Sequence, residues 1–420
     1  MTSVRKADGQ GPVPFVLPGE VPFRDTLAGW EHYRTSRGLF IPAPQLSLAE
    51  WRLLSPRRRM LHDLHRAATH ANLPVIATPM SAAVEKLLRA RIESNALKYK
   101  PTTRSGIMVF GGGFQGKTET VCEVCAAFED FWLDAHLHLP SARPGTRDLH
   151  APVAYIQTPV TAKPKSTCKA ILNLYGADHK YMDLPELIRQ VAQSLHDHGT
   201  KVLVLDDITR LRMHRADDQD VLDLIRAFMS MHVTLILIGV DIPGSGLLQE
   251  GRHDPRTGQY VFPPSAYAQQ VKVNGLEPTQ TERRFDLIEL DRFHYSTSEQ
   301  IAAWAAHLTG VEQHLRLMNA APGILAGGTM PEYLYRRTDG VVGLLERLLE
   351  DGCREAIDTG AEKLTENLLD NVVLRPPDVP ERDPAAGEVP VLPPQPTRRG
   401  KRGRNTVFDD HGPAAAGETR

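Results

Sequence analysis

A glycine-rich stretch followed by lysine and threonine is the part of this sequence best suited to chemistry. Residues 107–118 are Ile-Met-Val-Phe-Gly-Gly-Gly-Phe-Gln-Gly-Lys-Thr, which places Gly111, Gly116, Lys117 and Thr118 at the fixed positions of G-x-x-x-x-G-K-[ST]. Glycines let successive backbone N–H groups point into one concavity, and the start of a following helix adds its positive dipole end. The sequence therefore predicts a phosphate-binding loop of the Walker A type.

Each residue of this loop has an expected role in holding ATP. Lys117 would reach the terminal phosphates, and Thr118 would be a ligand of Mg²⁺. The residues expected to contact the nucleotide are Gly111, Gly112, Gly113, Phe114, Gln115, Gly116, Lys117, Thr118 and Glu119. The alternative is a glycine-rich turn with a chance Gly-Lys-Thr. Nucleotide binding is favoured because four apolar residues precede the loop and a helical periodicity follows it.

Two adjacent carboxylates end a later apolar run, Lys201-Val-Leu-Val-Leu-Asp-Asp207. P-loop enzymes that transfer phosphoryl groups use one carboxylate to hold the Mg²⁺ water shell and a neighbour to orient and deprotonate the attacking water. Asp206 fits the first role and Asp207 the second. Alone, the pair could equally be a strand-ending turn or a helix cap. Its combination with the phosphate-binding loop favours the catalytic interpretation.

Strands and helices alternate around these residues. Apolar runs predict strands, and three- to four-residue periodicity predicts helices between them. This alternation implies an α/β fold with a parallel sheet covered on both faces. A long insertion, residues 242–281, is expected to have little regular structure and to be functional. The expected strands are 107–110, 153–157, 201–207, 233–239 and 283–290, and the helices are 117–135, 166–175, 184–198 and 217–231.

Helical segments flank the alternating region. Before it, prolines break residues 26–98 into pieces that include helices at 56–70 and 81–95. On the first of these we expect a basic surface, either solvated or in contact with nucleic acid, with Met60, Leu61 and Leu64 available for packing. The basic surface comprises Arg57, Arg58, Arg59, His62, His65 and Arg66. After the alternating region, helices at 298–317, 331–337, 341–359 and 362–373 form a small all-helical domain.

The expected organisation has five parts. They are a disordered N-terminus (1–25), an N-terminal helical segment (26–105), a P-loop NTPase domain (106–295), a helical lid domain (296–373) and a disordered proline-rich and basic tail (374–420). The tail is too polar and too rich in proline to fold alone.

Composition limits the classes of function. The formal net charge is -2, so any polyanion site must be a local patch. No apolar run approaches a membrane span and the N-terminus lacks a signal-peptide core, so we expect a cytoplasmic protein without membrane contact. Cys122 and Cys125 form a lone C-x-x-C spaced as one helix face, which favours a place in the core over zinc or redox chemistry.

The sequence resembles the AAA+ ATPases, and within that class the TniB group of transposition ATP-binding proteins, which is related to the TnsC regulators. The resemblance covers roughly residues 26–373. Two departures matter. Asp207 stands where most hydrolytic relatives have Glu, which implies slow hydrolysis but intact binding, and Thr209 stands where relatives often carry His. Beyond the loop and acidic pair, the motifs are Trp51 and Arg59 leading to Ala77-Thr-Pro79, Gly239-Val-Asp-Ile-Pro-Gly-Ser-Gly246, Gln280-Thr-Glu-Arg-Arg-Phe285, Tyr335-Arg-Arg-Thr-Asp-Gly-Val-Val-Gly343-Leu-Leu and Gly360-Ala-Glu-Lys-Leu-Thr365.

The resemblance implies further roles. Asp241 matches a sensor of the γ-phosphate, although it could simply cap a turn. Arg283 or Arg284 matches an arginine finger that enters the neighbouring subunit's site, although a surface pair is the alternative. Arg347 matches a second sensor, but a solvated arginine is favoured. Lys163, Lys165 and Lys169 lie where relatives touch the DNA backbone, although an ordinary exposed loop is the alternative.

The function implied by the resemblance is that of an ATPase with ATP and Mg²⁺ as cofactors. The fold would be a P-loop AAA+ three-layer parallel sheet domain with an N-terminal helical segment and a C-terminal all-helical lid. The protein would assemble with ATP into a ring or filament on double-stranded DNA and recruit a transposase. A signalling or chaperone-like ATPase without a DNA role is the main alternative. A small-molecule P-loop kinase is less favoured because the helical domain and the Arg283–Arg284 pair have no obvious place in one.

Overall fold

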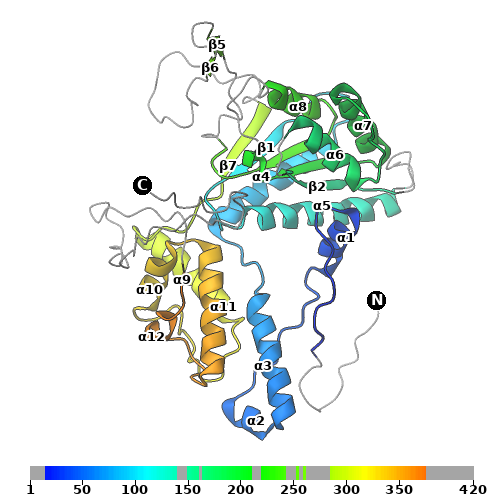
Figure 1. Cartoon of the computed structure of the whole chain (residues 1–420). Coiled ribbons are helices and arrows are strands. Elements are labelled where there is room, and N and C mark those ends of the chain that lie inside the picture. Colours follow the sequence, from blue (N-terminus) through cyan, green and yellow to red (C-terminus); the bar gives the residue numbers. More distant parts are fainter. Residues whose placement is uncertain are drawn as a thin grey trace, which may run out of the picture.

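Five parallel strands form the central sheet of the protein (Figure 1). The computed structural model describes residues 15–139, 149–159, 163–210, 219–242, 252–254, 259–261 and 284–374. The strand order is β2-β3-β4-β1-β7, so the strand before the phosphate-binding loop is flanked by β4 and β7. The bounds are β1 Gly106–Phe110, β2 Val153–Gln157, β3 Val202–Asp206, β4 Thr234–Ile238 and β7 Phe285–Glu289.

Helices cover both faces of this sheet and complete three layers (Figure 1). On one face, α6 (Pro164–Leu174), α7 (Leu184–Asp197) and α8 (Gln219–Met229) contribute residues to a single buried cluster. On the other face, α4 (Pro79–Ala96) and α5 (Lys117–His138) pack with α1 (Leu27–Ser36). Strands buried on both faces consist of near-continuous apolar residues, as the sequence of β4 shows. The expected α/β fold with its three layers is confirmed.

The N-terminal helical segment comprises α1, α2 (Leu48–Leu53), α3 (Pro56–Ala71) and α4. Ser47 forms a capping box with Glu50 at the start of α2, and the Ser55 hydroxyl accepts the Arg58 N–H at the start of α3. Pro56 at the first turn of α3 is compatible with a helix start, where its missing N–H costs nothing. In Figure 1, α2 and the start of α3 project away from the sheet domain.

The expected orientation of α3 is wrong. His62, His65 and Arg66 of the expected basic surface are buried, whereas Arg57 and Arg58 are exposed. The apolar residues expected to pack are exposed instead, with Met60 60% accessible, Leu61 43% and Leu64 40%. The reason is hydrogen bonding to partners that sequence does not reveal. His62 contacts the Pro44 carbonyl oxygen at 3.1 Å and His65 that of Ile41 at 2.8 Å. These buried imidazoles are therefore not part of a basic surface.

Arg66 ties α3 to the C-terminal helical domain. Its guanidinium is buried and donates to both carboxylate oxygens of Glu362, at 2.7 and 3.0 Å. It also donates to Asp63 at 2.6 Å. The two hydrogen bonds pair the positive charge of Arg66 with the negative charge of Glu362. A buried ion pair needs such close pairing to offset the cost of removing both charges from water. Arg66 is therefore a structural link rather than a nucleic-acid contact.

The C-terminal domain is all helical, as expected. Its helices are α9 (Ser298–Glu312), α10 (Met330–Thr338), α11 (Val342–Asp358) and α12 (Glu366–Leu369). They share a buried cluster around Trp304 and Tyr335. The last helix is four residues long rather than spanning 362–373. Thr365 caps α12 by accepting the Leu368 N–H, so the preceding residues cannot continue the same helix.

Three further expectations concern the remainder of the chain. The insertion at 242–281 contains an antiparallel pair, β5 (Arg252–Asp254) with β6 (Gln259–Val261), and its other residues beyond Ile242 lie outside the described part. Residues 1–14 and the basic tail also lie outside it. Within the described ranges, no helix has the length and apolar character needed to cross a membrane.

Cys122 and Cys125 lie in the core, as expected. Both are buried free thiols on the face of α5 that packs against the sheet. Among the described residues, no three His, Cys, Asp or Glu side chains are grouped as metal ligands.

Candidate functional site

The carboxyl edge of the sheet gathers the expected site residues. Because β3, β4 and β1 are adjacent and parallel, the segments that follow them emerge at the same edge. Gly111 follows β1, Asp207 follows β3 and Asp241 lies just beyond β4. Residues from three separate parts of the sequence therefore meet where a ligand of a doubly wound sheet is expected.

The glycine-rich loop has the backbone that its sequence predicts. Gly111 has φ +146°, and a Cβ there would lie 2.3 Å from the Leu290 carbonyl oxygen. Gly116 has φ +80° and immediately precedes α5. Gly111 thus leaves no room for a side chain, and Gly116 has a left-handed backbone conformation that favours glycine. The resulting cradle ends at a helix N-terminus, which suits an anion.

Lys117 points back into the loop. Its ammonium group donates to the Gly111 carbonyl oxygen at 3.1 Å and to that of Gly112. The side chain is buried, and burial lowers the pKa of its ammonium, while Asp206 and Asp207 oppose that effect. Lys117 is therefore a cation held among loop carbonyls within the field of two carboxylates, at the position from which it could reach phosphate oxygens.

Thr118 and Asp206 are in direct contact. The Thr118 hydroxyl donates to Asp206 Oδ2 at 2.9 Å, and Asp206 Oδ1 accepts the Asp207 N–H at 2.8 Å. Asp206 is buried at the end of β3. A hydroxyl and a carboxylate beside a phosphate cradle are the oxygen ligands that Mg²⁺ uses together with substrate phosphates. This donor set fits a magnesium–nucleotide site.

Asp207 lies beside Asp206 in a different environment. Its φ is +53°, a left-handed conformation that Asp adopts more readily than most residues. The Gln157 side-chain amide donates to Asp207 Oδ2 at 3.3 Å. Asp207 is only half-buried, so its carboxylate can face a water molecule in the site. This placement is compatible with an attacking-water role.

Sequence reasoning missed two residues of this site, Tyr155 and Gln157. Both come from β2, the strand next to β3. The Tyr155 hydroxyl donates to Asp206 Oδ2 at 2.7 Å, the same oxygen that accepts from Thr118. The available signal was the polar character of these two residues in an otherwise apolar strand. Their partners depend on strand register, which the sequence does not reveal.

The implied sensor and finger residues have different positions. Asp241 is exposed, with φ +46°. Desolvation and the charges of Asp291 and Asp241 raise the pKa of the Glu289 carboxyl at the end of β7. Arg284 is exposed immediately before β7, whereas Arg283 lies outside the described residues. Arg347 is exposed and pairs with Asp351 at 3.8 Å along α11.

The C-terminal helical domain contacts the glycine-rich loop through backbone atoms. The Gly343 N–H, at the start of α11, donates to the Phe114 carbonyl oxygen at 2.9 Å. A Cβ at Gly343 would lie 2.7 Å from that oxygen, so the contact requires glycine. Glu346 follows one turn later at the surface, where partial desolvation and the nearby carboxylates of Glu119 and Glu350 raise the pKa of its carboxyl.

Three lysines lie at the start of α6, beyond β2. Lys163 and Lys165 are exposed and Lys169 is half-buried. None of the three forms an ion pair with another described residue. They are therefore local cations on a protein of near-neutral charge.

A family model supports this architecture. Residues 102–242 match the model of the AAA domain family. The sheet domain has the AAA+ P-loop fold. That matched region contains the glycine-rich loop, both acidic residues and Asp241.

The chain is also similar to solved structures at low sequence identity. The chain is similar to the Orc1 protein of Aeropyrum pernix, solved in complex with DNA, with 16% identity, a TM-score of 0.47, and 72% of this chain and 67% of that chain covered. It is similar to Cdc6p from Pyrobaculum aerophilum, with 14% identity, a TM-score of 0.45, and 70% and 67% covered. No curated protein matches the sequence.

Proposed function

We propose that this protein binds ATP with Mg²⁺ at the glycine-rich loop and hydrolyses it. The observation that carries the proposal is the 2.9 Å hydrogen bond between the Thr118 hydroxyl and Asp206, beside the loop that holds Lys117. AAA+ domains are generally ATPases, which supports hydrolysis as the reaction.

Each residue of the site has a defined task in this proposal. The loop backbone from Gly111 to Gly116 binds phosphate oxygens, and Lys117 turns from its carbonyl partners toward the terminal phosphates. Thr118 and Asp206 hold Mg²⁺, whose chemistry is to neutralise charge that develops on the phosphate oxygens. Asp207 orients the attacking water and accepts its proton.

Residues around this centre have three further roles in the proposal. Glu119, in the first turn of α5, lies beside the nucleotide, and Asp241 senses the γ-phosphate from just beyond β4. Arg284, or Arg283 beside it, acts on the site of a neighbouring copy, for which its position before β7 at the surface is suitable. ATP binding therefore favours assembly of copies into a ring or filament, and hydrolysis favours disassembly.

We propose that the assembly forms on double-stranded DNA and regulates transposition or target selection by recruiting a transposase. The TniB-like motifs support the role in transposition. Exposed Lys163 and Lys165, with Lys169 behind them, supply cations for phosphate-directed contact. Such binding does not depend on base sequence and weakens with salt.

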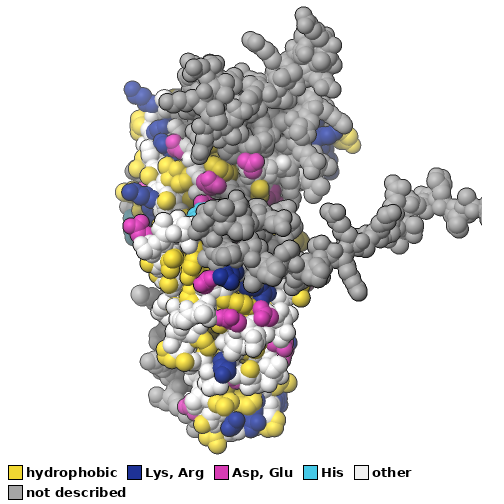
Figure 2. All heavy atoms as spheres, turned by 90° about the vertical axis from the view of Figure 1, so that its left-hand side faces the viewer, with side chains coloured by type: hydrophobic (Ala, Val, Ile, Leu, Met, Phe, Trp, Pro, Cys, Tyr) yellow, Lys and Arg dark blue, Asp and Glu magenta, His cyan; other side chains and the backbone are white. Residues whose placement is uncertain are grey.

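One observation favours a second candidate, a nucleotide-gated signalling or chaperone-like ATPase without a DNA role. The described part of the face in Figure 2 has Lys and Arg side chains interspersed with Asp and Glu, rather than a continuous basic surface. The formal net charge of -2 agrees with this distribution.

A gel-shift series separates the two candidates. Duplex DNA of mixed sequence is titrated with the protein at several salt concentrations, with ATP, with a slowly hydrolysed ATP analogue, and without nucleotide. The proposal requires tighter binding with nucleotide and a loss of affinity as salt rises. Equal affinity with and without nucleotide would contradict the switch, and no DNA binding in any condition would favour the second candidate.

A further inference from the structure

Tyr155 joins the acidic residue of the site to the N-terminal segment. It lies in the middle of β2, is 4% exposed, and stands opposite Val204 in the pairing of β2 with β3. Alternate residues of a strand share a face, so Asp206 is on the same face as Val204 and two residues nearer the carboxyl edge. The tyrosine ring is long enough to bridge that step, and its hydroxyl reaches Asp206 Oδ2 at 2.7 Å.

Asp206 Oδ2 therefore accepts hydrogen bonds from two hydroxyl groups, and the two side chains differ in their freedom to move. Thr118 is in the first turn of α5, beside the loop that must receive phosphate. Tyr155 is fixed within the sheet, and its side chain has no rotatable bond beyond the ring except that of the hydroxyl. The Tyr155 hydrogen bond thus keeps the Asp206 carboxylate oriented, whether or not Thr118 keeps its own hydrogen bond to Asp206 when a magnesium ion is bound.

The N-terminal segment packs directly on this tyrosine. The Trp30 ring of α1 stacks on Tyr155 with centroids 5.9 Å apart and planes inclined by 13°. The Arg24 guanidinium lies 5.9 Å from the Tyr155 ring centroid and 4.3 Å from that of Tyr33. Arg24 also donates to Glu119 at 2.7 Å, and Glu119 is the residue after Thr118. Arg24 belongs to the N-terminal stretch, residues 1–25, that the sequence predicts to be disordered.

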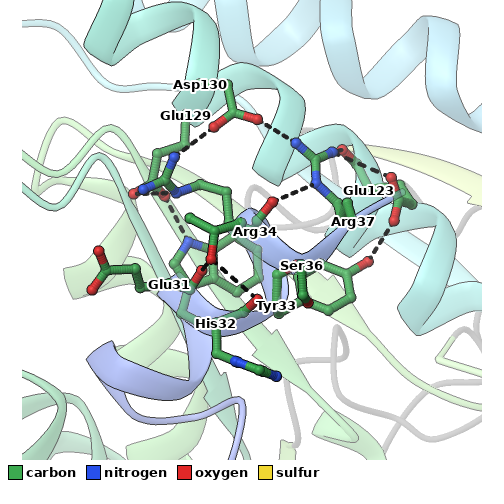
Figure 3. A network of polar contacts seen from close by, with 11 residues as sticks. Glu31, His32, Tyr33, Arg34, Ser36, Arg37, Glu123, Glu129 and Asp130 are labelled. Carbon is green, nitrogen blue, oxygen red and sulfur yellow. Dashed lines mark hydrogen bonds and ion pairs between the residues drawn. The ribbon is translucent and has the colours of Figure 1, made fainter. Parts of the chain in front are cut away.

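Further contacts hold α1 along α5 (Figure 3). The Trp30 indole N–H donates to Glu129 at 2.6 Å, and the Tyr33 hydroxyl donates to Glu123 at 3.0 Å. Arg34 donates to Asp130 at 2.6 Å. The Tyr33 hydroxyl also lies 3.4 Å from Glu119 Oε2, whereas Arg34 and its partners are further along α5. Arg24 and Trp30 are the residues of this contact whose rings or charges lie against Tyr155 itself.

We propose that Tyr155 is a positioning residue for the Asp206 carboxylate in the magnesium–nucleotide site, and that Arg24 and Trp30 of the N-terminal segment hold it in place. This inference rests on the function proposed above. A partner that drew the N-terminal segment off α5 would weaken magnesium binding without touching the phosphate-binding loop.

The direct test removes one oxygen. Tyr155→Phe keeps the ring and its stacking on Trp30 but removes the hydroxyl. Binding of a fluorescent ATP analogue is measured as magnesium is titrated, and again in EDTA. We expect the magnesium concentration for half-maximal binding to rise about tenfold, as for other groups that orient metal ligands, with unchanged affinity in EDTA.

The matched control is Tyr175→Phe. This variant also loses a hydroxyl hydrogen bond, the 2.7 Å contact between Tyr175 and Thr200. Tyr175, however, lies at the end of α6 on the other face of the sheet. We expect it to leave the magnesium titration unchanged. The same shift in both variants, or none in Tyr155→Phe, would overturn the positioning role. A wild-type protein that binds no nucleotide, or binds it without regard to magnesium, would instead overturn the proposed function.

A second pair of variants tests the N-terminal segment. Arg24→Ala removes the contacts of Arg24 with Tyr155 and Glu119. Arg34→Ala removes ion pairs between α1 and α5 that lie further from Asp206. We expect Arg24→Ala to shift the magnesium titration in the same direction as Tyr155→Phe, and Arg34→Ala to leave it unchanged. Equal shifts in these two variants would overturn the specific role of Arg24.

Discussion

The Thr118 hydroxyl donates a hydrogen bond to Asp206 Oδ2 over 2.9 Å, although the two residues are 88 positions apart. Parallel pairing within the sheet and the start of α5 at Lys117 bring them together. The contact places a hydroxyl and a carboxylate beside a phosphate cradle.

Removal of the Asp206 charge should separate magnesium binding from nucleotide binding. In Asp206→Asn, the amide keeps the shape of the side chain but lacks the negative charge. We expect ATP affinity in EDTA to be retained, and the additional affinity conferred by magnesium to fall by about 10- to 100-fold. Equilibrium titration of ATP with and without magnesium checks this expectation. A variant with the full magnesium effect would show that Asp206 is not at the metal.

Asp207 should matter for turnover rather than for binding. Asn tolerates the left-handed conformation at this position, so Asp207→Asn should leave the backbone unchanged. We expect phosphate release from ATP to slow by about 100-fold, since the variant lacks a general base, with little change in ATP affinity. Steady-state phosphate release and ATP titration measure the two quantities. Unchanged turnover would assign the base to another residue.

The link between α3 and the lid should be important for stability. In Glu362→Gln, the buried Arg66 guanidinium loses its bidentate carboxylate partner. We expect the free energy of unfolding to fall by about 3 kcal/mol, because an incompletely compensated charge remains buried.

Urea unfolding measures this loss, with Asp358→Asn as the matched control. Asp358 pairs with Arg354 at 3.2 Å, but both side chains are more than half exposed, so the control should cost less than about 1 kcal/mol. Similar losses in both variants would contradict a special role for the buried link.

Glu129 should make stability depend on pH. Burial raises the pKa of its carboxyl from 4.5 to about 7, while the Trp30 indole and Arg34 oppose the rise. A raised pKa in the folded state favours folding at low pH, and this contribution is lost as pH rises from about 4.5 through about 7.

The uncharged variant Glu129→Gln should lack this dependence. Relative to Glu129→Gln, the wild-type protein should lose up to about 3 kcal/mol of unfolding free energy between pH 4.5 and pH 8. Urea unfolding of both proteins across this range measures the difference. A constant difference across the range would show that Glu129 titrates as an ordinary surface carboxyl.

Sequence alone predicted the centre of the candidate site because its chemistry depends on local patterns. A phosphate-binding loop requires glycines, lysine and threonine at fixed spacing, and the apolar run before Asp206 identifies a strand that ends at the carboxyl edge. Parallel topology then places Thr118 and Asp206 at the same edge without further information. The layers of the fold followed from the same alternation.

Contacts between distant segments were not predictable in the same way. The orientation of α3 depends on carbonyl partners of His62 and His65 in an irregular segment, so its helical periodicity gave the wrong buried face. The contact of Tyr155 with Asp206 depends on the register of β2 and β3. Arg24 had no periodic pattern around it, and its role follows only from where α1 packs.

Binding of ATP to Lys117→Ala tests the central claim most directly. Isothermal titration calorimetry with magnesium present compares this variant with the wild type and with Lys363→Ala, which removes an exposed lysine of the lid domain. We expect wild-type affinity in Lys363→Ala and a loss of about 100-fold or more in Lys117→Ala, because the lysine at this position contacts the terminal phosphates. Undiminished ATP binding by Lys117→Ala would contradict the account.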